Sequence, residues 1–234
     1  MGLIFDDWYS SISVMEDQII LLDKPAGISS FGCVAKVRGA LKAQFGHKVK
    51  VGHTGTLDPF ATGLLILLSG KMTKKSGEFL KLDKEYVATV KLGFTSSTGD
   101  PEGEIRSCLN ITEIPKLSTI ESCLHGFIGK ISQTPPRYSA IKINGERAYK
   151  LARKGAEFEM PSREVEIYKI EVLRYEWPEL VIKCYVSSGT YIRTLAEDIG
   201  EKLGVGAYLT ALRRTRIGRF SVEDARELEE FSTS

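Results

Sequence analysis

An unbroken apolar run, Leu64–Leu68, follows directly on a glycine-rich loop, Gly52–Gly63, and these two segments constrain the fold more than any other part of the chain. A short apolar run of this kind is typical of a strand that is buried on both faces. The three glycines of the loop and Pro59 restrict its backbone. Because a proline biases the preceding residue toward extended geometry, we expect Asp58 to be held in one orientation beside a core strand.

Two interpretations of this loop stay open at this point. In the first, Asp58 and Pro59 form an ordinary turn that closes a hairpin, which is the common role of an Asp-Pro pair. In the second, the polar residues His53, Thr54 and Thr56 gather with Asp58 on a firmly anchored loop because they form a site.

Composition excludes several classes of protein. The chain has 234 residues, 42% of them hydrophobic and 26% charged, which is the balance of a globular protein with a substantial core. It has no apolar run of the roughly 20 residues that span a membrane. Residues 1–17 form an acidic leader without lysine or arginine, unlike a signal peptide. The four cysteines are scattered, which indicates neither disulfides nor a zinc site and favours the cytoplasm.

The net charge of +2 conceals a segregation of charge along the chain. Residues 24–57 hold six basic residues and no acid, residues 128–155 hold seven basic residues and one acid, and residues 205–220 hold four arginines and no acid. Each segment alone could be the solvated face of its own helix or loop. Their concurrence, with acids gathered at both termini and aromatic residues interleaved, favours a face that binds nucleic acid.

The rest of the chain alternates strand and helix patterns. We predict strands at 18–22, 85–93, 165–175 and 180–186, and helices from about Ser29 through Leu41, over 71–82, over 146–154 and from about 190 to 203. Ser118 and Glu121 have capping-box spacing and predict the start of a short helix. Asn144 and Gly145 predict a turn.

Arg193 and Tyr86 are the other candidate site residues. Arg193 falls in the first turn of a predicted helix, at the positive end of the helix dipole. It either pairs with Glu197 one turn later or is held there for an anionic partner, and an arginine of this kind would keep a half-buried Asp58 ionised. Tyr86 belongs to the inward face of its strand and is either a core aromatic or the member that reaches a pocket.

The possible chemistry is restricted by what the sequence lacks. It has no phosphate-binding loop and no dinucleotide fingerprint, so nucleotide-dependent chemistry is not supported. Glycoside hydrolysis normally needs two acids, and Asp58 is the one prominent candidate. A single carboxylate suits covalent or proton-abstracting chemistry on a base or a sugar.

Several motifs together resemble the TruB family, the tRNA pseudouridine-55 synthases. The resemblance extends from about residue 19 to residue 220 and rests on Asp23–Ser29, Gly52–Gly63, Lys84–Tyr86, Thr134–Lys142, Gly189–Arg193 and Ala207–Arg214. It implies isomerisation of one uridine in the T-loop of tRNA to pseudouridine, without metal or cofactor. The target base must leave its stack to be reached, and a looped, single-stranded target lowers that cost.

The resemblance also implies roles for individual residues. The catalytic residues would be Asp58, Tyr86 and Arg193. Tyr86 would stack on the target uracil, and Arg193 would pair with the aspartate. The residues that bind the flipped nucleotide or shape its pocket would be His53, Lys24, Pro25, Thr56, Tyr191 and Leu212. Residues 146–154 match a segment that closes over the T-arm, and the RNA-binding residues would be Arg137, Tyr138, Lys142, Arg147, Lys150, Arg153, Arg213 and Arg214.

We therefore expect an α+β catalytic domain over residues 18–220 with the pseudouridine synthase fold, a mixed and mainly antiparallel sheet flanked by helices around an RNA-binding cleft. The leader 1–17 and a short acidic tail, 221–234, would lie outside it, with no C-terminal PUA-type domain. The expected protein is a cytoplasmic monomer that acts on tRNA. The rivals are an RNA-binding module without catalysis and an enzyme of the same fold with another RNA substrate, such as the guided archaeal and eukaryotic relatives.

Overall fold

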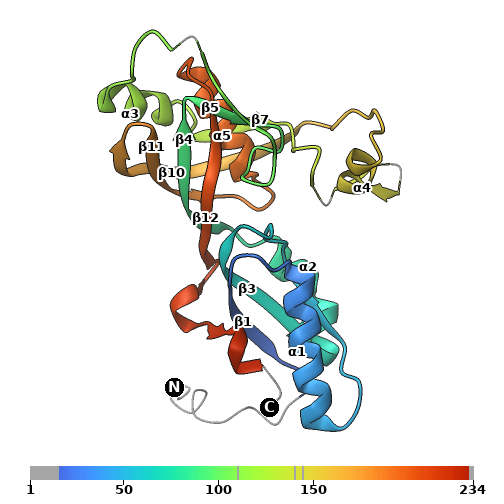
Figure 1. The fold of residues 1–234 in the computed structure, drawn as a ribbon. Coiled ribbons are helices and arrows are strands. Elements are labelled where there is room, and N and C mark those ends of the chain that lie inside the picture. The colour runs from blue at the N-terminus through green and yellow to red at the C-terminus, as the bar shows by residue number, and fades with distance from the viewer. Residues whose placement is uncertain (1–15, 110, 140, 144, 232–234) are drawn as a thin grey trace.

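The computed structural model describes residues 16–109, 111–139, 141–143 and 145–231, which form two lobes connected by one sheet (Figure 1). The strands of this sheet lie in the order β14 (Arg226–Glu227), β1 (Ile19–Lys24), β3 (Thr62–Ser69), β12 (Ala207–Ile217), β4 (Lys84–Leu92), β11 (Glu179–Val186), β10 (Arg163–Glu176) and β7 (Gly129–Gln133). The pairs β1–β14 and β3–β12 are parallel and the other pairs are antiparallel. The predicted α+β fold with a mixed, mainly antiparallel sheet is confirmed. Of the predicted leader, residues 1–15 lie outside the described ranges.

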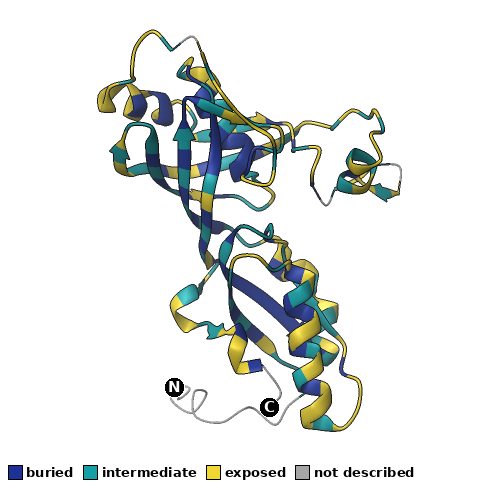
Figure 2. Cartoon of the chain, viewed as in Figure 1, coloured by how far each residue is buried: buried dark blue, intermediate teal, exposed yellow. Residues whose placement is uncertain are grey.

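Strand β3 is the centre of the lower lobe, and both of its faces are buried, as predicted (Figure 2). Leu65 and Leu67 pack with helix α1 (Ser30–Phe45), whereas Leu64, Ile66 and Leu68 belong to a separate cluster on the opposite face. The helix begins where its sequence predicts, because the Ser29 hydroxyl caps it by accepting a hydrogen bond from the Gly32 amide. The short strand β2 (Val51–His53) pairs with β3 and brings the glycine-rich loop to the top of this lobe.

The upper lobe packs two helices against the sheet. Alternate residues of β4 point into a core that also receives the apolar sides of α3 (Leu117–His125) and α5 (Ile192–Lys202). The predicted capping box at Ser118 and Glu121 is wrong, because Ser118 lies inside α3 and the helix begins one residue earlier without a side-chain cap. The apolar residues of α3 anchor it to the core, and this packing sets where the helix starts.

Shorter elements complete the two lobes. The predicted helix over 71–82 is divided into a 3₁₀ helix, Gly70–Lys75, and α2 (Ser76–Leu80). Strands β5 (Phe94–Ser96) and β6 (Ile105–Ser107) form a small hairpin, as do β8 (Lys142–Ile143) and β9 (Glu146–Arg147), and α4 (Ala148–Arg153) follows β9. Helix α4 and its hairpin project from the upper lobe (Figure 1). In the predicted acidic tail, β14 pairs with β1, and Leu228 and Phe231 are buried against the lower lobe. Two further short elements, β13 (Phe220–Ser221) and a 3₁₀ turn at Val222–Asp224, link β12 to β14. None of the helices within the described ranges is long and apolar enough to cross a membrane.

Gly63 lies where the glycine-rich loop enters β3, and the backbone of β12 passes directly against it. Its φ is 102°, and a Cβ atom there would lie 2.3 Å from the carbonyl oxygen of Arg214. We expect Gly63→Ala to lower the free energy of unfolding by at least about 2 kcal/mol, because both the backbone strain and the clash must be relieved. Chemical denaturation measures this loss. Gly39 in α1 has open space around it, so Gly39→Ala is the matched control and should instead raise stability by about 0.5–1 kcal/mol.

Candidate active site

Hydrogen bonds from residues 24–30 fix the loop that carries Asp58. The amide of Gly27 donates to the carbonyl of Pro59 at 2.8 Å, and the Lys24 ammonium donates to the same carbonyl at 3.2 Å. The hydroxyl of Ser30 accepts from the amide of Leu57 at 2.8 Å and donates to its carbonyl at 2.9 Å. The start of α1 and the turn before it therefore hold the Asp58 loop in place.

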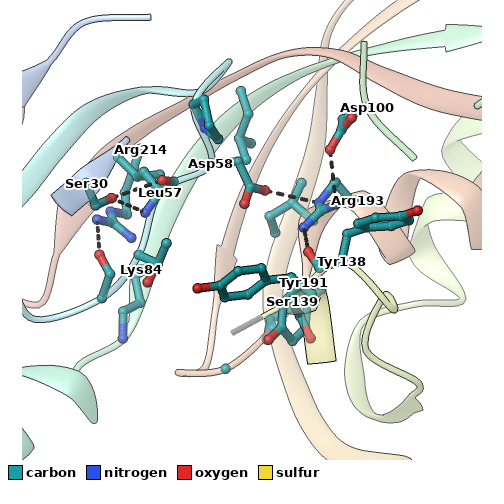
Figure 3. Close-up of a pocket in the computed structure, with 18 of the residues that line it drawn as sticks. Ser30, Leu57, Asp58, Lys84, Asp100, Tyr138, Ser139, Tyr191, Arg193 and Arg214 are labelled. Carbon is teal, nitrogen blue, oxygen red and sulfur yellow. Dashed lines mark hydrogen bonds and ion pairs between the residues drawn. The ribbon is translucent and has the colours of Figure 1, made fainter. Parts of the chain in front are cut away.

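Arg193 is the centre of the polar arrangement around Asp58. It is the second residue of α5 and only 4% exposed, and its Nε lies 3.1 Å from Oδ2 of Asp58. Its Nη1 contacts Oδ2 of Asp100 at 3.0 Å, and its Nη2 donates to the carbonyl of Tyr138 at 2.8 Å (Figure 3). Within the described ranges its ion pairs are with these two aspartates and not with Glu197. The guanidinium thus connects segments that are far apart in the sequence.

Asp100 is the site residue that sequence reasoning missed. It is almost fully buried, and besides Arg193 it accepts hydrogen bonds from the Thr98 hydroxyl at 2.5 Å and from the Glu102 amide at 3.0 Å. Its segment, residues 96–103, has neither helical nor strand periodicity. The available signal was an Asp-Pro pair in a loop that also holds two glycines, which resembles the Asp58 loop in composition.

Two opposing effects act on the pKa of Asp58. Burial raises the pKa of the Asp58 carboxyl above its usual value, and the opposing effect of Arg193 does not fully cancel it. Asp100 adds to the rise, because a second carboxylate disfavours ionisation of the first. Arg193 therefore limits the rise in the pKa of Asp58 rather than depressing it, and leaves a carboxylate that is more basic than an ordinary aspartate.

A cavity of about 990 Å³ opens over Asp58 at the junction of the two lobes. Many of the residues singled out from the sequence line it: Asp58, Tyr86, Arg193, His53, Thr56, Tyr191, Leu212, Tyr138, Arg147, Arg153 and Arg214. Tyr86 satisfies both of its interpretations, because it packs in the core of the upper lobe and also lines the cavity. Burial, followed by the charges of Arg214 and Arg147, lowers the pKa of His53, so this imidazole is neutral at neutral pH.

Other candidate residues lie away from this cavity. Lys24 and Pro25 do not line it, and the Lys24 ammonium is buried behind the Asp58 loop. Arg213 contacts Asp23 through two nitrogens at 3.1 and 2.6 Å, so its guanidinium joins β12 to β1. Arg137 donates to the carbonyl of Ala156 at 2.7 Å. Lys142 and Lys150 are exposed on the projecting hairpin and on α4. Their roles in RNA binding stay predictions.

The arrangement presents the Asp58 carboxylate to the cavity as its reactive group. Within the described ranges, no cluster of three or more histidine, cysteine or acidic side chains could hold a metal ion. Asp58 presents its carboxylate to a cavity whose walls carry tyrosines and arginines. A planar base can stack on the tyrosines while the carboxylate acts on the attached sugar, which is chemistry suited to a nucleotide drawn out of an RNA strand.

Comparison with known proteins identifies relatives along nearly the whole chain. Residues 41–192 match the family model described as "TruB family pseudouridylate synthase (N terminal domain)", and residues 193–234 match "tRNA pseudouridylate synthase B C-terminal domain". A protein of Phocaeicola vulgatus named tRNA pseudouridine synthase B is 45% identical over 217 residues, covering 92% of each chain. One of Desulfotalea psychrophila with the same name is 48% identical over 222 residues, covering 90% of this chain and 88% of its own.

Solved structures show the same fold. The structure entitled "Crystal Structure of a Cbf5-Nop10-Gar1 Complex" superposes with a TM-score of 0.69 at 32% identity, covering 92% of this chain and 53% of that chain. "Structure of H/ACA RNP bound to a substrate RNA containing 2'-deoxyuridine" gives a TM-score of 0.66 at 30% identity. The chain thus spans about half the length of these solved relatives, and its own fold is a pseudouridine synthase fold.

Proposed function

The chain belongs to the TruB family of tRNA pseudouridine synthases, and we propose that it converts the uridine at position 55, in the T-loop of tRNA, into pseudouridine with Asp58 as the catalytic residue. The enzyme is an isomerase that acts on tRNA. The observation that carries the proposal is the contact of Asp58 with Arg193 at 3.1 Å inside a cavity lined by Tyr86 and Tyr191.

The isomerisation breaks the N1–C1′ bond of uridine, turns the uracil and joins its C5 to C1′, with the C5 proton released. We assign to Asp58 the step on the sugar, either as nucleophile at C1′ or as base at C2′, and both routes need an ionised carboxylate. Arg193 holds that carboxylate, so it is a positioning residue. To Tyr86, which lines the cavity, we assign stacking on the uracil and removal of the C5 proton. We further infer that the enzyme works as a monomer in the cytoplasm.

The reaction is tested with a purified tRNA transcript that carries tritium at C5 of its uridines. Tritium release by the chain alone supports the proposal, and a transcript with cytidine at position 55 should release none. Release that persists on the cytidine transcript would place the modified uridine elsewhere. No release unless other proteins or a guide RNA are added would favour a guided enzyme of the same fold.

The raised pKa of Asp58 predicts the acid limb of the pH profile. Since the reaction needs the carboxylate, the single-turnover rate at saturating RNA should fall as pH decreases through the pKa of Asp58. Burial places that pKa above the usual 3.8, so the midpoint of the fall should lie above 3.8. A stopped assay of tritium release across acidic pH measures it. A rate that stays constant down to pH 3.8 would contradict the assignment of Asp58.

A further inference from the structure

Arg214 is a buried cation that forms no ion pair with any of the described residues. It lies on β12 and is 1% exposed, its Nε donates to the carbonyl of Leu64 at 2.8 Å, and its Nη2 donates to the carbonyl of Gly55 at 3.2 Å. Within the described part of the chain it forms no ion pair with a carboxylate, and its Nη1 has no hydrogen-bond partner. The residue nevertheless lines the cavity. A buried charge left unpaired in this way is costly, so an anion at this position would stabilise it.

Lys84 repeats this arrangement on the neighbouring strand. It is the first residue of β4, is 6% exposed, and lines the same cavity. Its ammonium donates to the carbonyls of Leu80 and Leu82, which leaves one N–H for another acceptor, and no carboxylate within the described ranges forms an ion pair with it. Burial and the charge of Arg214 lower the pKa of Lys84 to about 8, which agrees with a second cation placed nearby.

Other buried cations near the loop are fully satisfied. Lys24 donates to three carbonyls and does not line the cavity, so it has no donor left for a ligand. Arg193 has two carboxylates. Figure 3 shows Asp58 between the two groups, with Arg193 and Asp100 on one side and Arg214 and Lys84 on the other. Of the buried cations that line the cavity, the two that form no ion pair within the described ranges therefore lie on β12 and β4.

We propose that Arg214 and Lys84 form a binding site for one phosphodiester of the RNA, the one attached to the nucleotide whose sugar meets Asp58. The proposal rests on the proposed function, because it takes RNA as the ligand. An RNA strand supplies phosphates next to each sugar, and arginine and lysine N–H groups are strong donors to phosphate oxygens. Because Arg214 also holds the carbonyl of Gly55 in the Asp58 loop, it positions the phosphate relative to the catalytic carboxylate.

The test is a double-mutant cycle that combines an uncharged phosphate analogue in the RNA with an uncharged side chain at position 84. Two T-arm hairpins carry pseudouridine at the target position, so nothing turns over, and each has a methylphosphonate in place of one of the two phosphates flanking that residue. The wild-type chain should lose affinity by about tenfold or more for one of these hairpins. Lys84→Met should bind the hairpin with normal phosphates more weakly than the wild-type chain does. Replacing that same phosphate by methylphosphonate should then weaken RNA binding by Lys84→Met less than threefold further, about the level of one weak contact.

Controls separate a lost contact from a damaged fold. Lys91→Met removes a charge from the same strand outside the cavity, and this variant should show the full wild-type loss. Thermal unfolding tests the integrity of Lys84→Met, and Lys84→Gln, whose amide can still donate to the two carbonyls, is the second variant. The log–log salt dependence of hairpin binding should also become shallower by about 0.7 in Lys84→Met.

The outcomes distinguish this site from the proposed function. Equal losses in wild type and in the Lys84 variants at both phosphates would overturn the site, even if pseudouridine forms normally. If one phosphate is coupled to Lys84 but no tritium is released from position 55, the result would support the phosphate site and count against the assigned reaction.

Discussion

Asp58→Asn is expected to reduce the single-turnover rate of pseudouridine formation by on the order of 10⁴-fold or more, while RNA affinity changes by no more than a few-fold. An amide has neither the nucleophilicity nor the basicity that the sugar step requires, yet it occupies the same volume. The measurement is tritium release at saturating RNA, together with filter binding of the same transcript. If the variant retains a tenth of the wild-type rate, Asp58 is not the catalytic residue.

Asp58→Asn should also affect the thermal stability of the protein. A carboxyl whose pKa is raised on folding stabilises the protein at low pH, and this contribution is lost as pH rises through the folded-state pKa. At neutral pH the ionised Asp58 is therefore a cost to the fold, and Asp58→Asn should have a Tm no lower than wild type. Asp224→Asn, at an exposed turn, is the matched control and should change neither rate nor Tm.

Arg193→Lys is expected to have the second largest effect, a rate about a hundredfold lower at saturating RNA with near-normal RNA binding. A single ammonium cannot contact Asp58, Asp100 and the carbonyl of Tyr138 with the geometry of the guanidinium. The carboxylate would keep its charge partner but lose its orientation. Single-turnover kinetics and hairpin binding measure the two quantities.

Arg193→Met supplies a readout that a purely structural arginine would not produce. Removing the cation leaves Asp100 buried without its partner, which costs about 3–5 kcal/mol, and removes the effect that holds down the pKa of Asp58. The acid limb of the rate profile should then move to higher pH. Wild-type rates in Arg193→Lys, with an unchanged pH profile in Arg193→Met, would show that Arg193 only supports the fold.

Local sequence patterns were sufficient for the elements that carry the site. The apolar run Leu64–Leu68 predicted a strand buried on both faces because no polar residue interrupts it, and β3 is such a strand. The pattern at Ser29 predicted the start of α1 because a cap acts within three residues of itself. The alternation in β4 predicted that Tyr86 points inward, although it did not predict that the core would open into a cavity there.

Contacts between distant segments were harder to predict. Arg193 was expected to need an anion, but Asp100 lies 93 positions away in a loop without helical or strand periodicity, so nothing local connected the two. Arg213 belongs to a basic run that suggested RNA, yet the parallel pairing of β12 with β3 brings it against Asp23. The adjacent Arg214 projects from the opposite face of the strand and lines the cavity. Charge counting cannot separate these neighbours, because strand pairing decides which one is free to meet a ligand.

The proposed function of this chain is tested most directly by where pseudouridine forms. The decisive measurement is single-nucleotide mapping of pseudouridine in a full-length, unmodified tRNA transcript after incubation with the purified chain or with Asp58→Asn. We predict one pseudouridine per molecule, at position 55, with the wild-type chain and none with the variant. A transcript left unmodified at position 55 by the wild-type chain would contradict the proposed reaction, and equal modification by both proteins would contradict the role of Asp58.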